Sequence, residues 1–257
     1  MSIEYGSRGL IGLLTPQANT TVEPEFWSLL PPGFSAINGR LTSRCDSLEA
    51  RLVDYFDHLE QACTQFANAP LGCIGVACTG ASYLVGRERE AELIAAIERR
   101  HGIPLITAAG AVVAALRALG ARRIGLSSPY PESLSKASVA YWSSQGFEVT
   151  AISAAATDDT QFHPIYSIPA EAAARTLAVL KRPDVDVIIM LGTGMPTLGT
   201  IAALSGWDGP PVISCMLALG WRCVSTLAPE LAPMPLWTTT PHWKPRLDML
   251  FPATPQT

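Results

Sequence analysis

Short runs that are apolar at almost every position alternate along the chain with longer segments whose apolar residues recur at helical spacing. Continuous apolar runs are typical of strands that are covered on both faces, as in a parallel sheet. They predict strands at residues 11–15, 73–77, 105–107, 124–127, 185–191 and 212–214. Helical spacing predicts helices at residues 48–68, 87–100, 109–119, 132–145, 170–181 and 216–227. This alternation predicts an α/β fold with mainly parallel strands.

Three segments from the first part of the chain recur in the second part, in the same order and each at a predicted strand. Ile11-Gly-Leu-Leu-Thr-Pro16 resembles Ile124-Gly-Leu-Ser-Ser-Pro129, and Cys78-Thr-Gly80 resembles Gly192-Thr-Gly194. The third pair is Ile103-Pro-Leu-Ile-Thr107 and Pro210-Pro-Val-Ile-Ser214. Chance similarity between generic strands is the alternative, but the shared order favours a duplicated unit. We therefore expect two pseudo-symmetric halves, each with a mostly parallel sheet flanked by helices, and an active-site cleft between them.

The repeat also predicts where the halves divide. The first half, which carries the cysteine loop, is expected at residues 1–108 with a C-terminal return at 226–257, and the second half at 109–225. Ligands of such folds bind beyond the carboxyl ends of the strands. Four repeated segments end there in turn-forming residues, which lie at 15–19, 78–82, 128–130 and 192–197. If the halves face each other, these four loops converge on one cleft.

The composition is that of a folded protein with few charges. Of the 257 residues, 48% are hydrophobic and 16% are charged, and the net charge is −4. A nucleic-acid or membrane-surface protein would need a basic stripe, which the sequence lacks. The longest apolar runs, such as 108–116, are too short to span a bilayer, and the first residues lack the apolar core of a signal peptide. We expect a cytoplasmic protein with no nucleic-acid or membrane partner.

The sequence also lacks the patterns of common metal and nucleotide sites. None of the six cysteines forms a Cys-x-x-Cys pair, and the four histidines are scattered. A structural zinc site therefore has little support. Neither a phosphate-binding Gly-x-x-x-x-Gly-Lys-Ser/Thr loop nor a Gly-x-Gly-x-x-Gly after the first strand occurs. We expect no metal and no cofactor.

Cys78 is the residue with the strongest chemical signal. It lies at the end of a predicted strand, near the N-terminus of the helix that follows, and precedes Thr79, Gly80 and Ser82. Backbone N–H groups and the positive end of a helix dipole favour a thiolate, the form that acts as nucleophile or base. If Cys78 is the catalytic thiolate, its pKa must lie below the value of about 8.5 of a free cysteine. A buried, inert cysteine is the alternative, and it is the interpretation we prefer for Cys63 and Cys73.

The neighbouring loops are rich in hydroxyls, amides and glycine and poor in charge. Gly80 and Gly194 allow backbone amides to approach a ligand, and Thr79, Thr193 and Thr197 add donors. Such neutral donors suit an oxyanion or a carboxylate. Asn19 could turn its amide toward a ligand carboxylate. Alternatively, its loop only caps a helix that opens at Val22, through Thr20 or Thr21.

The chain resembles the aspartate/glutamate racemase superfamily, and most closely its maleate cis-trans isomerase and arylmalonate decarboxylase branch. The resemblance spans about residues 8–230 and rests on four motifs, which are Thr15-Pro-Gln-Ala-Asn-Thr-Thr21, Ala77-Cys-Thr-Gly-Ala-Ser82, Ser128-Pro-Tyr130 and Leu191-Gly-Thr-Gly-Met-Pro-Thr197. It implies two pseudo-symmetric α/β halves around a cleft, with Cys78 as the nucleophile. The substrate-binding residues it implies, together with the donors of the loops, are Asn19, Thr79, Gly80, Tyr130, Gln161, Gly192, Thr193 and Gly194.

Within that set, the resemblance gives some residues specific roles. Asn19 matches a carboxylate-binding asparagine, Tyr130 a tyrosine near the substrate carboxylate, and Thr79 a donor to a substrate oxygen. Gln161 stands where the isomerases carry another asparagine. One residue departs from the pattern, because Gly192 occupies the position of the superfamily's usual second cysteine. Racemisation needs an acid and a base on opposite faces of the substrate carbon, so it is difficult for a chain with no second thiol. The arylmalonate decarboxylases carry their working cysteine in the second half, which is the reverse of this chain.

The resemblance, together with Gly192 at the position of the usual second cysteine, leaves three possible functions. The first is a cofactor-independent cis-trans isomerase of a maleate-like small dicarboxylate, acting through a covalent adduct on Cys78. The second is a cofactor-free decarboxylase of a malonate-type acid, with Cys78 as proton donor. The third is a non-catalytic protein that binds small acids. The Asn19 loop favours the isomerase, because the isomerases share it. The sequence leaves a homo-oligomer open.

Overall fold

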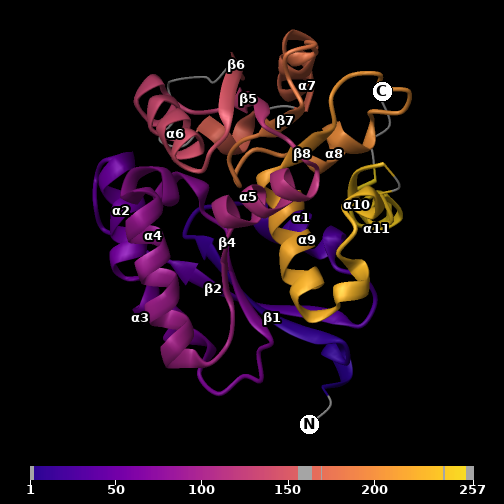
Figure 1. Ribbon diagram of the computed structural model, residues 1–257. Coiled ribbons are helices and arrows are strands. Elements are labelled where there is room, and N and C mark those ends of the chain that lie inside the picture. The colour runs from indigo at the N-terminus through magenta and orange to yellow at the C-terminus, as the bar shows by residue number, and fades with distance from the viewer. Residues whose placement is uncertain (1–2, 156–163, 169, 240, 253–257) are drawn as a thin grey trace.

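The computed structural model describes residues 3–155, 164–168, 170–239 and 241–252. Their strands form two separate parallel sheets of four strands each (Figure 1). The first sheet has the order β2-β1-β3-β4, with β1 at Gly9–Pro16, β2 at Phe34–Leu41, β3 at Cys73–Val76 and β4 at Leu105–Thr107. The second has the order β6-β5-β7-β8, with β5 at Arg123–Ser128, β6 at Glu148–Ala154, β7 at Val187–Met190 and β8 at Val212–Ser214. The identical strand order confirms the predicted pair of similar α/β halves.

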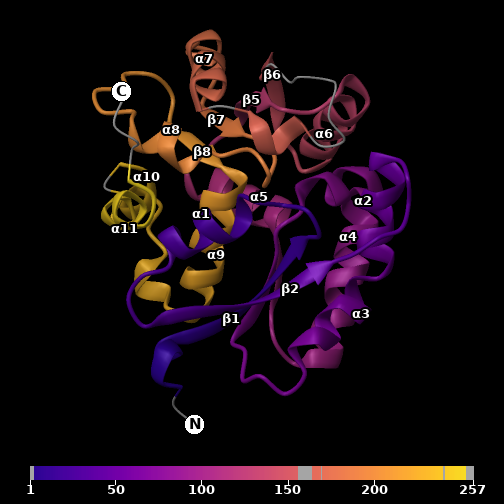
Figure 2. The ribbon, with the colours of Figure 1, turned by 180° about the vertical axis from the view of Figure 1, so that it is seen from behind.

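Helices connect the strands in both sheets. The α-helices up to β5 are α1 (Val22–Leu29), α2 (Leu48–Asp57), α3 (Leu59–Cys63), α4 (Thr79–His101) and α5 (Ala108–Ala118). Those that follow are α6 (Glu132–Ser144), α7 (Ala170–Leu180), α8 (Leu198–Ala202), α9 (Cys215–Leu227), α10 (Pro235–Thr238) and α11 (Lys244–Leu250). Short 3₁₀ helices lie at Glu4–Gly6, Thr64–Phe66, Pro164–Ser167 and Pro229–Leu231. Figures 1 and 2 show α2–α4 on one side of the first sheet and α1 and α9 on the other.

The predicted strands are the inner strands of the two sheets together with β4 and β8. The sequence prediction missed β2 and β6, which lie at the outer edges. Both edge strands are partly exposed, and Ile152 in β6 is 47% exposed. An edge strand with mixed exposure has no continuous apolar run, so the pattern that revealed the others is absent. The predicted helix at 48–68 is also interrupted at His58, where α2 ends and α3 follows.

The helix after Cys78 begins earlier than the sequence predicted. Instead of starting at Arg87, α4 runs from Thr79, and its two parts meet at Gly86. Gly86 has a φ of +78°, a left-handed conformation that glycine adopts without steric cost. Because the first part of α4 starts directly after β3, the N-terminal N–H groups of the helix reach Cys78.

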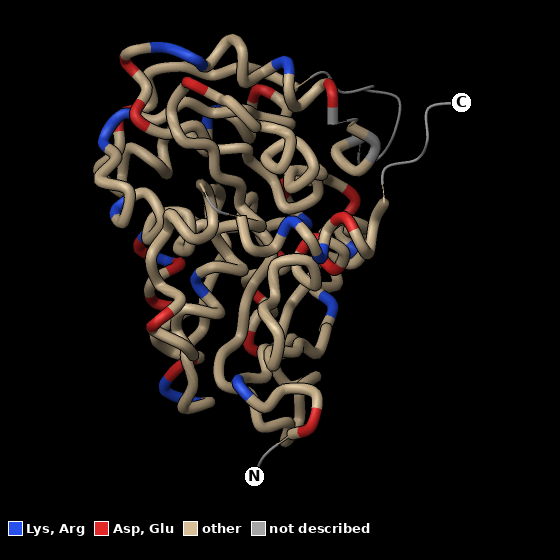
Figure 3. Tube along the Cα trace, turned by 90° about the vertical axis from the view of Figure 1, so that its right-hand side faces the viewer, with Lys and Arg blue, Asp and Glu red and all other residues tan. Residues whose placement is uncertain are grey.

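The two halves are connected through α9 and through the C-terminal segment. Although α9 follows β8 of the second sheet, it packs against β1, β3 and β4 of the first sheet. The proline-rich segment after it forms α10 and α11, buries Trp237 and Trp243, and returns to α1, where Arg246 donates to the carbonyl oxygens of Ser28 and Leu29. Acidic and basic residues are interspersed over both halves (Figure 3). Among the described residues, no helix is long and apolar enough to cross a membrane.

A buried carboxylate also links the halves. Glu25, on α1, accepts hydrogen bonds from the Thr197 hydroxyl at 2.9 Å and from the backbone N–H of Leu198 at 2.8 Å, at the start of α8. The Thr197 N–H donates to the same carboxylate. Burial raises the pKa of Glu25 to about 7, although these three donors oppose the rise.

The raised pKa of Glu25 predicts a pH dependence of stability. The folded protein holds this proton more tightly than the unfolded chain, so the contribution of Glu25 is most favourable below its ordinary value of 4.5. It is lost as the pH rises toward 7, and the loss amounts to roughly 3 kcal/mol. Urea unfolding of wild type and Glu25→Gln at pH 4.5, 6 and 7.5 measures it. The free energy of unfolding of wild type should fall relative to the variant over this range, whereas parallel profiles would contradict the prediction.

Candidate active site

Cys78 lies at the junction of β3 and α4, at the carboxyl edge of the first sheet. It is the residue before the first turn of α4, with an extended backbone, and its side chain is 3% exposed. The backbone N–H groups of Gly80 and Ala81 lie close enough to its sulfur to lower the pKa of the thiol, although the Cys78 side chain makes no capping hydrogen bond to α4. Gly80 packs closely against α2, because a Cβ there would lie 2.9 Å from a methyl group of Leu52, which would have to shift. The strand-to-helix turn therefore aims two backbone donors at one buried thiol.

The expectation that the pKa of Cys78 is lowered was wrong for the protein without substrate. Burial raises this pKa to about 11, and the N–H groups of Gly80 and Ala81 offset only part of the rise. A thiolate in a site that excludes water loses more hydration than two backbone donors return. At neutral pH the resting Cys78 is therefore mostly a neutral thiol.

Thr79 connects the Cys78 turn to the second half of the molecule. Its hydroxyl lies 2.9 Å from the Tyr130 hydroxyl, which comes from the loop after β5. Thr79 is buried and Tyr130 is partly buried, and desolvation raises the pKa of Tyr130 well above its ordinary value. The Tyr83 ring packs edge-on against the Tyr130 ring with 6.1 Å between centroids. Tyr130 consequently stays a neutral hydroxyl that can donate to an anion.

Asn19 and Thr193 form a second connection between the halves beside Cys78. The Thr193 hydroxyl donates to the carbonyl oxygen of Ala77 at 2.7 Å, and the Asn19 side-chain NH₂ lies 3.5 Å from the same hydroxyl oxygen. The Asn19 side-chain oxygen accepts from the backbone N–H groups of Thr21 and Val22, so Asn19 caps α1. Thr21, one of the two expected caps, instead donates its hydroxyl to the carbonyl oxygen of Gly194 at 2.7 Å.

Two glycines of the loop after β7 allow this close approach. Gly192 has a φ of +85°, and a Cβ there would lie 2.8 Å from Ile165 and 3.3 Å from the Tyr130 hydroxyl. A Cβ at Gly194 would lie 2.6 Å from the Tyr166 ring. Larger residues would therefore displace the side chains that surround the loop.

The structure brings together every predicted site residue that it describes. Asn19, Thr193 and Gly194 meet on one side of the Cys78 turn through the contacts above. Thr79, Tyr130 and Gly192 meet on the other. Gln161 lies outside the described residues. The substrate-binding roles of these residues remain predictions, because contacts within the protein do not identify a ligand.

Sequence reasoning missed a second buried thiol in this cluster. Cys215, the first residue of α9, is fully buried, and its sulfur has the Gly192 N–H and the Thr79 hydroxyl as hydrogen-bond donors. Its position directly after the repeated segment 210–214 was the available signal. That segment ends a strand at the same edge of its sheet as the repeated loops, so its next residue also belongs to the candidate site.

A buried arginine was missed as well. Arg51 on α2 is buried, and its guanidinium donates through Nε and Nη2 to the carbonyl oxygen of Cys45. Its positive charge lowers the pKa values of Tyr55 and Tyr166, whereas a negative charge on Cys78 raises both. Burial has the largest effect and raises the pKa of Tyr55 to about 12. The surroundings of Cys78 thus include one cation as well as neutral donors.

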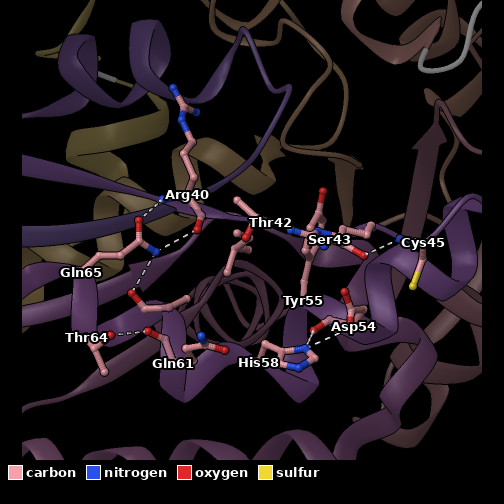
Figure 4. A pocket seen from close by; sticks show the side chains of 13 residues that line it. Arg40, Thr42, Ser43, Cys45, Asp54, Tyr55, His58, Gln61, Thr64 and Gln65 are labelled. Carbon is pink, nitrogen blue, oxygen red and sulfur yellow. Dashed lines mark hydrogen bonds and ion pairs between the residues drawn. The ribbon is translucent and has the colours of Figure 1, made fainter.

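A separate pocket of about 850 Å³ lies between the loop after β2 and helices α2 and α3 (Figure 4). Figure 4 shows Arg40 and Gln65 hydrogen-bonded at one end and His58 paired with Asp54 at the other. None of the predicted site residues in the described part of the chain lines it. It is therefore distinct from the group of residues around Cys78, here called the Cys78 cluster, which comprises Asn19, Cys78, Thr79, Tyr130, Thr193 and Cys215. Among the described residues, no group of three or more His, Cys, Asp or Glu side chains is placed to hold a metal ion.

Proteins of known activity share this sequence pattern and this fold. The family model for arylmalonate decarboxylase matches residues 11–235. The maleate isomerase of Pseudomonas putida is 27% identical over 234 residues, covering 84% of this chain and 91% of the relative. That of Nocardia farcinica is 30% identical over 228 residues, covering 84% and 89%. A solved structure of Nocardia farcinica maleate cis-trans isomerase, a cysteine-to-serine variant with a covalently bound succinylcysteine intermediate, matches with a TM-score of 0.70 at 27% identity, covering 85% of this chain and 92% of that chain.

Proposed function

The chain belongs to the arylmalonate decarboxylase family, and on that premise we propose that it is a cofactor-independent cis-trans isomerase of a maleate-like small dicarboxylate, acting through a covalent adduct on Cys78. The observation that carries the proposal is the Cys78 turn, where a buried thiol meets the N–H groups of Gly80 and Ala81 at a helix N-terminus. The relatives named maleate isomerase, and the succinylcysteine adduct in one of them, support this choice over other reactions of the family.

The chemistry of the adduct explains why a thiol suffices. A thiolate adds to one carbon of the double bond, which turns that bond into a single bond about which the molecule can rotate. Elimination of the thiolate after rotation restores the double bond in the other geometry. Nothing is oxidised or reduced, so the reaction consumes no cofactor.

The donors around Cys78 suit the two carboxylates of such a substrate. The Asn19 amide and the Tyr130 and Thr79 hydroxyls are neutral, so they can bind an anion without a net charge of their own. Backbone N–H groups and the α4 dipole remain available for the thiolate. Substrate carboxylates beside Cys78 disfavour the thiolate, so the neutral donors must carry much of their charge.

The decarboxylase of malonate-type acids is the second candidate, and two observations favour it. The family model carries that name, and a neutral thiol, as burial enforces for Cys78, is suited to protonating a carbanion. The substrate-binding residues would then hold the enediolate that remains after carbon dioxide leaves.

Incubation of the protein with maleate and, separately, with phenylmalonate tests the proposal, with both reactions followed by NMR. We expect fumarate from maleate and unchanged phenylmalonate. Phenylacetate without fumarate would replace the isomerase by the decarboxylase. No turnover of either acid, with binding of both, would favour the small-acid binding protein and contradict the proposed isomerase.

A further inference from the structure

Cys215 stands at the same edge of its sheet as the catalytic loops, although its position in the repeat is not that of Cys78. Ser214 caps α9 by accepting the Leu217 N–H at 3.1 Å, just as Thr107 caps α5 by accepting the Gly110 N–H at 3.0 Å. Ser214 pairs with Met190 in the register of β7 and β8. The chain therefore leaves β8 for Cys215 beside the point where it leaves β7 for Gly192.

The contacts of Cys215 place its sulfur in the Cys78 cluster. Its thiol has two hydrogen-bond partners, the backbone N–H of Gly192 and the hydroxyl of Thr79. Thr79 is also the chain neighbour of Cys78, so the two thiols share one adjacent residue. Tyr130 lies near both, since a negative charge on either Cys215 or Cys78 raises its pKa.

The backbone geometry at Gly192 disfavours a second thiol at that position. A side chain at 192 would be strained by the φ of +85° and would project toward the Tyr130 hydroxyl, 3.3 Å away. Cys215, the first residue of α9, lies close enough to Tyr130 for a negative charge on its sulfur to raise the pKa of that hydroxyl. Gly192, which the repeat pairs with Cys78, thus has no side chain. The thiol of Cys215, directly after β8, lies near the same groups instead.

A buried hydroxyl with a shared partner lies in this cluster. The Tyr83 hydroxyl is buried near Thr79, Cys215 and Tyr130, and the contact that lowers its pKa is with the Thr79 hydroxyl, although the two do not form a hydrogen bond of good geometry. Thr79 also pairs with Tyr130 and contacts Cys215, so Tyr83, Tyr130 and Cys215 all depend on one hydroxyl. A substrate carboxylate at the cluster would accept a hydrogen bond from Tyr83 and relieve this competition.

We propose, on the basis of the proposed isomerase function, that Cys215 is a second catalytic thiol, which protonates the substrate carbon adjacent to the one bonded to Cys78 and later removes a proton from it. Cys78 first loses its proton to water, and its thiolate forms the C–S bond with its own electron pair, while the π pair moves to the adjacent carbon and its carboxylate. That carbon takes the proton of Cys215, which becomes a thiolate. After rotation, Cys215 removes a proton, the C=C bond re-forms and the C–S bond breaks, which releases the Cys78 thiolate. Cys78 then regains a proton from water, so both thiols return to their starting states.

Burial keeps both thiols protonated before the substrate binds. It raises the pKa of Cys215 to about 12 and that of Cys78 to about 11. Cys215 therefore carries the proton that a general acid must supply. Each thiol also has donors that favour its ionisation, so the positions of the two thiols assign their roles, and their acidities do not.

Turnover of maleate in D₂O by wild type and Cys215→Ser tests the proposal, with fumarate and its deuterium content measured by NMR. In D₂O the Cys215 thiol carries deuterium, so part of the fumarate formed by wild type should carry solvent deuterium. Cys215→Ser should lower kcat on the order of a hundredfold, the usual contribution of a general acid–base group. It should also lower the deuterium incorporated per fumarate formed. Cys223→Ser is the matched control, a fully buried cysteine farther along α9 that faces Gly75. Its kcat and deuterium incorporation should match wild type.

Each other outcome has a distinct meaning. Wild-type fumarate without deuterium would overturn the role of Cys215 even if the serine variant failed to fold. A folded Cys215→Ser with full turnover would overturn it too. A slower variant with the wild-type deuterium content per fumarate would show that Cys215 only supports the structure. If wild type itself does not convert maleate, the proposed isomerase function fails, which is a different result.

Discussion

Replacing Cys78 by serine is expected to lower kcat/KM for maleate by at least about 10³-fold, the scale of losing a covalent nucleophile. A serine hydroxyl is nearly isosteric with the thiol but far less acidic, so it supplies almost no anion to add to the double bond. The Gly80 and Ala81 N–H groups and the burial of the site are unchanged by the substitution. The melting temperature should therefore stay close to that of wild type, and initial-rate NMR assays with thermal unfolding measure both quantities.

Cys73→Ser provides the comparison within the same strand. Cys73 opens β3, is fully buried, and its sulfur lies 3.9 Å from the carbonyl oxygen of Cys223, away from the donors of Cys78. A hydroxyl there enters an apolar core, so this variant should lose stability and keep its activity per folded molecule. A fully active Cys78→Ser would remove the covalent mechanism. A folded but inactive Cys73→Ser would show that activity does not report specifically on Cys78.

The fold was predictable wherever burial on both faces leaves a continuous apolar run. The segments around Ile11, Ile74 and Ile188 are such runs, and each is an inner strand of its sheet. The edge strands β2 and β6 were not predictable in this way, because residues such as Ile37 and Ile152 face solvent there. The repeat still predicted two similar sheets, because the repeated segments lie at strands other than β2 and β6.

The candidate site was predictable as far as its loops follow the repeated strands. Asn19, Cys78, Tyr130 and Thr193 all lie just after a strand, and parallel strands present these ends at one edge. Glu25 lies within a helix and contacts the distant residue Leu198, which no local pattern reveals. Arg51 also lies within a helix, and its charge reaches Tyr166 from another part of the chain. Cys215 had a local signal, but as a single residue it was indistinguishable from a buried apolar cysteine.

The sign of the Cys78 pKa shift was not predictable either. Local sequence showed a helix start nearby, which lowers the pKa, whereas the burial that raises it depends on how the rest of the chain packs around Cys78. Desolvation is a property of the assembled structure and outweighs two backbone donors here. The formation of the Cys78 thiolate is therefore coupled to substrate entry and to the groups that substrate displaces or contacts.

Thr79→Val is expected to lower kcat/KM on the order of 10²-fold, the usual effect of removing one preorganised donor from an active site. Valine matches threonine in shape and removes only the hydroxyl, which joins Tyr130 at 2.9 Å and also reaches the Cys215 thiol. Without it, Tyr130 loses its fixed orientation and its hydroxyl is left unpaired in a buried site. The free energy of unfolding should therefore also fall by about 1–3 kcal/mol. NMR assays and urea unfolding of the same samples measure the two effects.

Thr176→Val separates the catalytic effect from the loss of stability. Thr176 is buried in the second half, and its hydroxyl lies 2.6 Å from the Ser127 hydroxyl, so the substitution leaves a comparable buried hydroxyl unpaired. It should cost a similar free energy of unfolding while kcat/KM stays within about twofold of wild type, since no predicted site residue is touched. Thr79→Ser, which keeps the hydroxyl, should recover most of the activity lost in Thr79→Val. If Thr79→Val and Thr176→Val lose activity equally, the loss follows stability, and Thr79 has no direct part in binding the substrate or positioning Tyr130 for it.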